Sequence, residues 1–323
     1  MPFHPLSTTA RSRAYKAFEL ASVAIRSAAG IALLLTTFGC GPKNLKTAVV
    51  LYCAQDQVFA EPILADFSRA TGVPVKTLFD SEAVKTVGLA NRLIAERDRP
   101  MCDVYWGNEE LRTRQLLARG VLRSDAWASF GHRTRTLVAR SAADLPGSFT
   151  ELTNSRWRGR FSIAYPLFGS TCTHFLVLRH HWGASTWKVW CQALAANRPF
   201  LEEGNSQVIR RLQRSEVKAG FTDSDDVRAA RREGADLVMA LDGTETFRLP
   251  NTVALVSGRS DRPEVRRLYD YLQSPEVRRS LITVGALDPE SEGTRSVGLD
   301  PNWSEILASL DLAIAELQEI FQR

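Results

Sequence analysis

Residues 47–79 read TAVVLYCAQDQVFAEPILADFSRATGVPVKTLF, and this stretch decides the fold class. The apolar run 47–53 is short enough for a buried strand. Apolar residues then recur at helical spacing until Gly72, a residue type that commonly ends a helix. They are Phe59, Ile63, Leu64 and Phe67. A second strand-like run covers 73–79, so the stretch predicts two parallel strands joined by a crossover helix.

The same alternation continues along most of the chain. Further strands are expected at 102–106, 161–165, 217–221, 236–241 and 252–256. Further helices are expected at 82–96, 109–119, 172–182, 187–196, 204–214, 224–233, 263–272, 275–285 and 301–321. Strands that alternate with helices of this length predict an α/β fold, in which mostly parallel sheets are flanked by helices on both faces.

The first forty residues have the layout of an export signal. Basic residues come first, the apolar run 27–38 follows, and Gly39 stands directly before Cys40. The run is shorter than the roughly 20 apolar residues that span a bilayer. We therefore predict that 1–39 is a signal peptide of the lipoprotein type and that Cys40 carries the lipid. Thr37 and Phe38 fit the lipoprotein pattern poorly, so an ordinary signal cleaved nearby is the alternative.

The remaining chain carries little net charge. The whole sequence has a formal charge of +5, of which residues 1–39 contribute a net +3, so +2 remains. This balance argues against a nucleic-acid surface. After Cys40, four cysteines remain, none of them in a C-x-x-C pair: Cys53, Cys102, Cys172 and Cys191. We expect these four to be free, buried thiols.

Polar residues gather where the expected strands end and helices begin. Open parallel sheets bind ligands beyond the carboxyl ends of their strands. The candidate ligand-binding residues are Gln55, Asp56, Asp80, Trp106, Asn108, Glu109, Ser170, Thr171, Asn205, Ser206, Thr222 and Asp223. Ser, Asn and Asp are also ordinary helix N-caps, so each position alone has a purely structural explanation. Their expected convergence on one edge favours a binding site.

Six segments, in this order along the chain, resemble the binding proteins of bacterial ABC importers. They are Tyr52–Val73, Cys102–Glu110, Gly204–Val208, Ala219–Asp226, Leu249–Val256 and Tyr269–Val277. The chain is most similar to the family-1 solute-binding proteins of the iron(III) and thiamine type, over about residues 46–322.

This resemblance implies a two-lobed periplasmic-binding-protein fold of type II, with a hinge of two or more strands and a ligand cleft. Residues 41–140 and 252–323 would form the first lobe, and residues 141–251 the second. It also implies an extracytoplasmic, monomeric receptor that delivers a small ligand to an inner-membrane ABC permease. The membrane would be reached through the lipid anchor only.

The resemblance makes ferric iron the leading ligand, as cargo and not as a cofactor. Iron-binding relatives carry adjacent tyrosines where this chain has Asp225 and Asp226. That departure argues against phenolate ligation, but carboxylates also suit hard cations. A cation site of Asp223, Asp225 and Asp226 is therefore expected. The alternative is that Ser224 caps a helix and the two aspartates only satisfy its dipole.

Other ligands and classes stay open. An organic cation of the thiamine or polyamine type would suit carboxylates beside an aromatic face. A phosphorylated anion, or an anion that accompanies ferric iron, would suit the helix starts at Ser170 and Ser206. We expect no enzyme, because Cys172 and His174 stand two residues apart on one helix and no G-x-S-x-G motif surrounds them. A hydrolase and a ligand sensor are the alternatives from other classes.

Overall fold

The computed structural model of the chain describes residues 48–80, 87–240, 243, 245–259, 261–289 and 298–322. These residues all belong to one structural unit, Lys46–Arg323. The predicted signal segment 1–39 and Cys40 lie outside the described residues. Among the helices described, none is both long and apolar enough to cross a bilayer.

The described strands form one hydrogen-bonded sheet. Its order is β2 (Val75–Phe79), β1 (Val49–Cys53), β3 (Val104–Gly107), β9 (Phe247–Val256), β4 (Leu122–Ala139), β7 (Ala219–Asp223), β5 (Phe161–Ala164) and β6 (Phe200–Glu202), and β8 (Val238–Ala240) pairs with β4. β1 runs parallel to β2 and β3, and β5 runs parallel to β6 and β7. The predicted α/β class is confirmed. Pairing is parallel within the groups β1–β3 and β5–β7, whereas every described pair that involves β4 or β9 is antiparallel.

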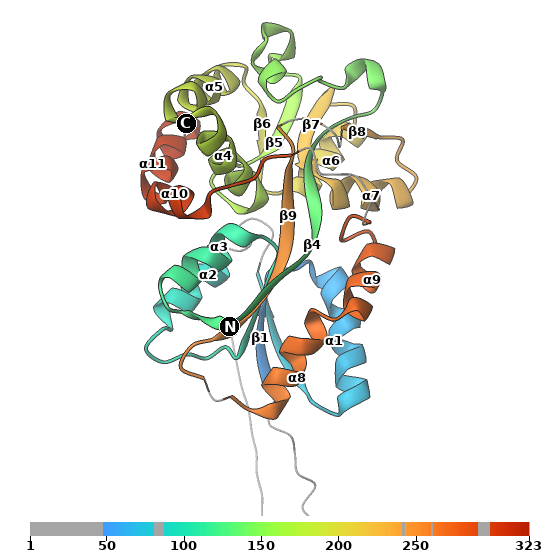
Figure 1. Ribbon diagram of the computed structural model, residues 1–323. Helices are drawn as coiled ribbons and strands as arrows, with labels where there is room; N and C mark the ends of the chain where they lie inside the picture. Colours follow the sequence, from blue (N-terminus) through green and yellow to red (C-terminus); the bar gives the residue numbers. More distant parts are fainter. Residues whose placement is uncertain are drawn as a thin grey trace, which may run out of the picture. The chain divides into compact units, whose positions relative to one another are not determined.

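Two long antiparallel strands, β4 and β9, connect the two parallel groups (Figure 1). β9 pairs with β3 through Thr252–Leu255, whereas β4 pairs with β7 through Arg135–Ala139. The register between β4 and β9 shifts between Phe130 and Arg133. We call β1–β3 and the helices on them the first half, and β5–β7 and the helices on them the second half.

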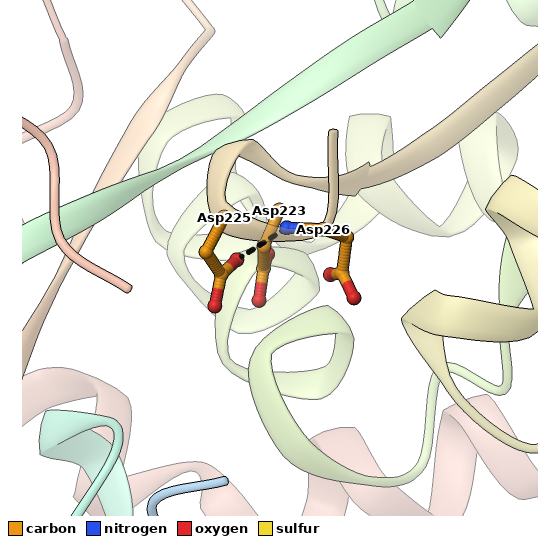
Figure 2. Close-up of side chains that lie close together, drawn as sticks. All are labelled: Asp223, Asp225 and Asp226. Carbon is orange, nitrogen blue, oxygen red and sulfur yellow. Dashed lines mark hydrogen bonds between the residues drawn. The ribbon is translucent and has the colours of Figure 1, made fainter. Parts of the chain in front are cut away.

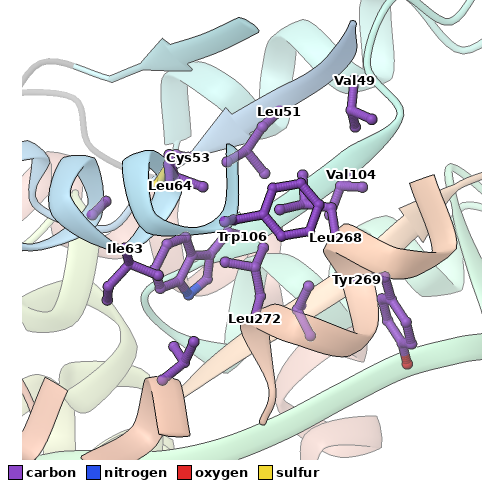
Figure 3. Close-up of a cluster of buried hydrophobic side chains, with 14 of the residues drawn as sticks. Val49, Leu51, Cys53, Ile63, Leu64, Val104, Trp106, Leu268, Tyr269 and Leu272 are labelled. Atoms are coloured by element: carbon purple, nitrogen blue, oxygen red, sulfur yellow. The ribbon is translucent and has the colours of Figure 1, made fainter. Parts of the chain in front are cut away.

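Helices cover both faces of each half. In the first half, α1 (Gln57–Thr71), α8 (Pro263–Leu272) and α9 (Pro275–Thr283) share one core with β1 and β3 (Figure 3), while α2 (Val87–Ala95) and α3 (Glu110–Ala118) share another. In the second half, α4 (Gly169–Trp182), α5 (Ala184–Ala196) and α11 (Leu310–Phe321) share a core, and α6 (Asn205–Gln213) and α7 (Ser224–Arg232) another. Short 3-10 turns lie at Ala142–Asp144, Thr150–Thr153 and Ser155–Trp157.

The C-terminal helices do not follow the lobe boundaries that were expected from the sequence. α10 (Trp303–Ala308) and α11 form separate helices where one was expected. Leu317 and Phe321 of α11 share a core with Phe161 and Phe175 of the second half, although the sequence analysis placed the tail in the first lobe. The apolar stripe of the tail is the reason, because it packs against the apolar side chains of α4 and α5 and is buried with them.

The four expected thiols are confirmed as free and buried. Cys53, Cys102, Cys172 and Cys191 each lie in a hydrophobic core. Burial raises the pKa of the Cys172 thiol to about 11, and nearby charges only partly modify this effect. These cysteines therefore act as small apolar side chains.

Candidate functional site

Strand ends and helix starts of both halves surround one cavity of about 60 Å3. Nine residues predicted from the sequence line it: Gln55, Asp56, Asn108, Ser170, Thr171, Asn205, Asp223, Asp225 and Asp226. Their convergence follows from topology. Antiparallel pairing through β9 and β4 sets the strands of the second half opposite in direction to those of the first, and the carboxyl ends of both groups reach this cavity. The connecting strand β9 helps to orient this wall, since Asn251 Nδ2 donates to Gln55 Oε1 at 3.0 Å.

Two predicted residues lie in the protein interior and not at the cavity. Trp106 is fully buried in the core beneath α1 (Figure 3), because successive strand residues point to opposite faces. Glu109 is also fully buried and caps α3 by accepting from Leu111 N at 2.7 Å and Arg112 N at 3.0 Å. Burial raises the pKa of the Glu109 carboxyl, and these hydrogen bonds partly offset the effect.

Three further predicted residues support neighbouring structure. Asp80 Oδ2 accepts from Leu89 N at 2.9 Å, in the first turn of α2. Thr222 is fully buried, and its hydroxyl donates to Asp226 Oδ2 at 3.2 Å. Ser206 Oγ lies 3.5 Å from Arg210 Nη2 along α6. None of the three is among the residues described as lining the cavity.

Two arginines of β4 were missed by the sequence analysis, and they determine how Asp223 is held. Arg133 Nε donates to Asp223 Oδ2 at 2.9 Å, and Arg135 Nη1 donates to Asp223 Oδ1 at 2.5 Å. The two arginines are two positions apart in a strand, so they extend from the same face. Both are almost fully buried, and Arg135 also stacks on the ring of Phe221 at 4.1 Å.

The charges of these arginines keep Asp223 ionised. Burial by itself would raise the pKa of Asp223, but Arg135 and Arg133 outweigh it and lower that pKa to about 2. Both carboxylate oxygens of Asp223 are engaged by guanidinium groups. Asp223 therefore links β4 to β7 and shapes the wall of the cavity.

Asp223, Asp225 and Asp226 form the acidic cluster expected from the sequence. One carboxylate oxygen from each lies within 4.8 Å of the others. Figure 2 shows the three side chains next to one another at the start of α7, with their carboxyl groups on the same side of the turn. Asp225 and Asp226 also lie in the first turn of α7, where the helix dipole favours them. The arrangement is thus compatible with a cation and with a dipole role for the two aspartates. The expectation that Ser224 caps the helix is wrong, because Asp223 holds the N-cap position and Ser224 is the first residue of α7, with its hydroxyl bonded to Asp288.

Helix starts form the opposite wall. The N-cap residues of α4 and α6 are Phe168 and Gly204. Neither residue has a side-chain acceptor for the first backbone N–H groups of its helix. Asn205 Nδ2 joins the two helix starts to the cluster, because it donates to Ser170 Oγ and Asp223 Oδ2 at 3.0 Å each. This wall offers hydrogen-bond donors beside the carboxylates.

The residues considered for catalysis lie away from the cavity. Cys172 and His174 are almost fully buried in α4, and His174 Nε2 lies 2.8 Å from the carbonyl oxygen of Glu245. Burial, together with the charge of Arg135, lowers the pKa of His174 to about 3. At neutral pH this histidine is an uncharged part of the core, packed against Phe149 and Phe221.

The sequence profile of one family, described as bacterial extracellular solute-binding protein, matches residues 49–285. The chain belongs to this family. This result confirms the family predicted from the six segments. The chain is therefore the ligand-binding component of an ABC importer, which works outside the cytoplasm, binds a small ligand and docks on a permease.

Solved structures share the fold of this solute-binding protein. Iron-bound HitA from Pseudomonas aeruginosa matches with 17% identity and a TM-score of 0.70, over 85% of this chain and 99% of that one. A ferric binding protein from Campylobacter jejuni matches with 15% identity and a TM-score of 0.72, over 85% and 100%. AfuA from Actinobacillus pleuropneumoniae, with fructose-6-phosphate bound, matches with 15% identity and a TM-score of 0.74, over 86% and 99%. At these identities the likeness shows the two-lobed fold alone. A comparison with curated protein sequences finds no match.

Proposed function

We propose that this solute-binding protein captures a hard cation, with ferric iron as the transported ligand. The observation that carries the proposal is the charge of the cavity. Five carboxylates line it: Asp56, Glu203, Asp223, Asp225 and Asp226. Arg133 lines it as well, and Arg135 lies behind Asp223, so an excess of three negative charges remains. Carboxylates that lie this close repel one another, and a bound positive charge relieves this repulsion.

Asp225 and Asp226 are the carboxylates that we assign to the cation. Asp223 is held by both arginines at 2.9 and 2.5 Å, whereas the ion pair of Asp225 Oδ2 with Arg133 Nε is longer, at 3.8 Å. Both Asp225 and Asp226 line the cavity. Carboxylate oxygens are the preferred ligands of hard cations. Of the solved structures named above, one is iron-bound and another is of a ferric binding protein, which supports iron over other hard cations.

A phosphorylated anion is the second candidate, and a different observation favours it. The starts of α4 and α6 present backbone N–H groups to the cavity, and Arg133 adds a positive charge there. AfuA, which has the same fold, was solved with a sugar phosphate. The two walls also allow a ferric ion accompanied by a small anion. The acidic cluster distinguishes the two candidates, because it attracts a cation and repels a phosphate.

The export signal in the sequence supports the proposal that Cys40 carries a lipid, which holds the receptor at the membrane. We further propose that the receptor acts as a monomer without catalytic activity. A ligand sensor is distinguished from a transport receptor by its partner, because only the latter stimulates the ATPase of a reconstituted importer when ligand is present.

A thermal-shift screen of the full-length chain tests the ligand class. The probes are Fe3+ supplied as its nitrilotriacetate complex, spermidine, thiamine, inorganic phosphate and fructose 6-phosphate. A ligand that binds the native state stabilises it by about 2.7 kcal/mol at a hundredfold excess over Kd. We expect Fe3+ to raise Tm and the organic cations to leave it unchanged. If phosphate or the sugar phosphate raises Tm while Fe3+ alone does not, the cation proposal is wrong.

A further inference from the structure

The turn after α9 lies against the irregular part of β4. A Cβ atom at Gly131 would come within 2.5 Å of Leu287 Cδ1, so Leu287 packs directly on this glycine. Asp288 N donates to the carbonyl oxygen of His132 at 2.7 Å. Thr134 Oγ1 donates to Asp288 Oδ2 at 2.6 Å. Because Leu287 belongs to the core of the first half, this turn fixes the point where β4 passes toward the second half.

The carboxylate of Asp288 also reaches the second half. Ser224 Oγ donates to Asp288 Oδ1 at 2.5 Å, and Arg228 Nη1 donates to the same oxygen. Ser224 Oγ in turn accepts from Thr134 N at 3.0 Å. Asp288 is 7% exposed, so little water competes for these hydrogen bonds. A single carboxylate of the first half thus holds β4 and the start of α7 together.

Ser224 lies inside the aspartate turn, residues 223–226, which lines the cavity. Any shift of Ser224 moves Asp223 and Asp225, its covalent neighbours. A second contact reinforces the arrangement, because Arg232 Nη1, two turns along α7 from the aspartate turn, donates to the carbonyl oxygen of Val284. The helix that begins at the binding site is therefore attached to the first half along its length.

We infer that Asp288 is a positioning residue, which places the aspartate turn for ligand binding and sets the angle between the two halves. A rotation of the second half about the Gly131–His132 part of β4 has to break the hydrogen bonds of Asp288 to Ser224 and Arg228. Asp288 does not line the cavity as described, so its effect on a ligand passes through Ser224. The statement on affinity rests on the proposed function, whereas the statement on the angle does not.

Small-angle scattering of the ligand-free, full-length chain tests the angle. The variant is Asp288→Asn, which keeps the size of the side chain and removes its charge. The matched control is Asp261→Asn, which removes an exposed carboxylate paired with Arg123 on the first half. We expect a larger radius of gyration for Asp288→Asn alone, because the halves open more readily. Identical scattering of the wild type and Asp288→Asn overturns the inference, whether or not iron binds.

Titration with Fe3+ as its nitrilotriacetate complex tests the positioning. We expect Asp288→Asn and Ser224→Ala to weaken binding about tenfold, which corresponds to about 1.4 kcal/mol, and Asp261→Asn to bind as the wild type does. A purely structural role would lower Tm and leave the Kd measured well below Tm unchanged, and this outcome contradicts the inference. If Asp288→Asn does not fold, Ser224→Ala decides by both readouts, since it removes the hydrogen bonds of the Ser224 hydroxyl to Asp288 and Thr134 N and keeps the Asp288 carboxylate. Absence of iron binding in the wild type refutes the proposed function and leaves the scattering result to decide.

Discussion

Arg135 and Asp223 form an ion pair whose two side chains are 0% and 3% exposed, with 2.5 Å between Nη1 and Oδ1. The pair joins β4 to β7 directly beside the cavity, and Arg135 also donates to Thr171 Oγ1 at 3.1 Å at the start of α4. One buried guanidinium thus organises three elements of the binding wall. It also occupies the carboxylate of Asp223, which therefore contributes less to binding a cation than Asp225 and Asp226 do.

Replacement of Arg135 by Met should strongly destabilise the protein. The change leaves Asp223 with one guanidinium partner in place of two, in a buried site. Removal of one member of a buried ion pair costs about 3–5 kcal/mol. Arg69→Met is the matched control, because Arg69 pairs with Asp66 on an exposed helix face and such pairs contribute about 0–1 kcal/mol. Urea unfolding followed by circular dichroism measures both, and equal losses would contradict the role given to Arg135.

His174 should make the protein less stable in mild acid. Its pKa is about 3 in the folded state, against about 6.5 for an unperturbed histidine. Between these values the unfolded chain binds a proton that the folded chain excludes, so stability falls as the pH is lowered from 6.5 toward 3. The contribution is at most about 1.4 kcal/mol per pH unit.

The variant His174→Phe tests this pH dependence. A phenylalanine at this position would lie among Phe149, Phe221 and Phe247 and cannot take up a proton. Unfolding free energies measured between pH 7 and pH 4 should therefore fall less steeply in the variant than in the wild type. Parallel curves for the wild type and His174→Phe would refute the assignment.

Two glycine variants separate backbone strain from packing at the connection between the halves. Gly120 and Gly131 have φ values of +66° and +56°, which cost an alanine about 1–2 kcal/mol. No described heavy atom lies within 4 Å of a Cβ at Gly120, whereas a Cβ at Gly131 meets Leu287. We expect Gly131→Ala to lower Tm more than Gly120→Ala does. Equal shifts would mean that Leu287 moves aside without cost.

The positions of the polar turns could be predicted from the sequence, because they follow from local pattern and topology. Short apolar runs in the sequence predicted the strands β1, β3, β5 and β7. The polar residues that follow these runs were predicted to come together in one binding site. Asp56, Asn108, Ser170 and Asp223 do line one cavity. Local pattern gives the turns of each half, but the shared cavity also depends on the long-range pairing of β4 with β9, which joins the two groups with opposite strand directions.

The strand β4 could not be recognised from the sequence in the same way. It contains Asp125, Arg133 and Arg135, and charged residues at alternate positions resemble an exposed loop. The burial of these arginines depends on Asp223, which neutralises their charge. Asp223 lies 90 residues after Arg133 in the sequence. The spacing Arg133-Thr134-Arg135-Thr136 has the period of a strand, and this was the one local signal available. Trp106 was wrongly predicted to contact the ligand, because the local sequence does not show to which face of the sheet its side chain points.

Titration of the full-length chain with Fe3+, supplied as its nitrilotriacetate complex, tests the assignment of Asp225 and Asp226 most directly. The double variant Asp225→Asn/Asp226→Asn is compared with Asp66→Asn/Asp270→Asn, which removes the same charge from exposed helix positions. We predict that the control binds iron like the wild type and that the double variant binds about a hundredfold more weakly, equivalent to about 2.7 kcal/mol. Undiminished iron binding by the double variant would contradict the account.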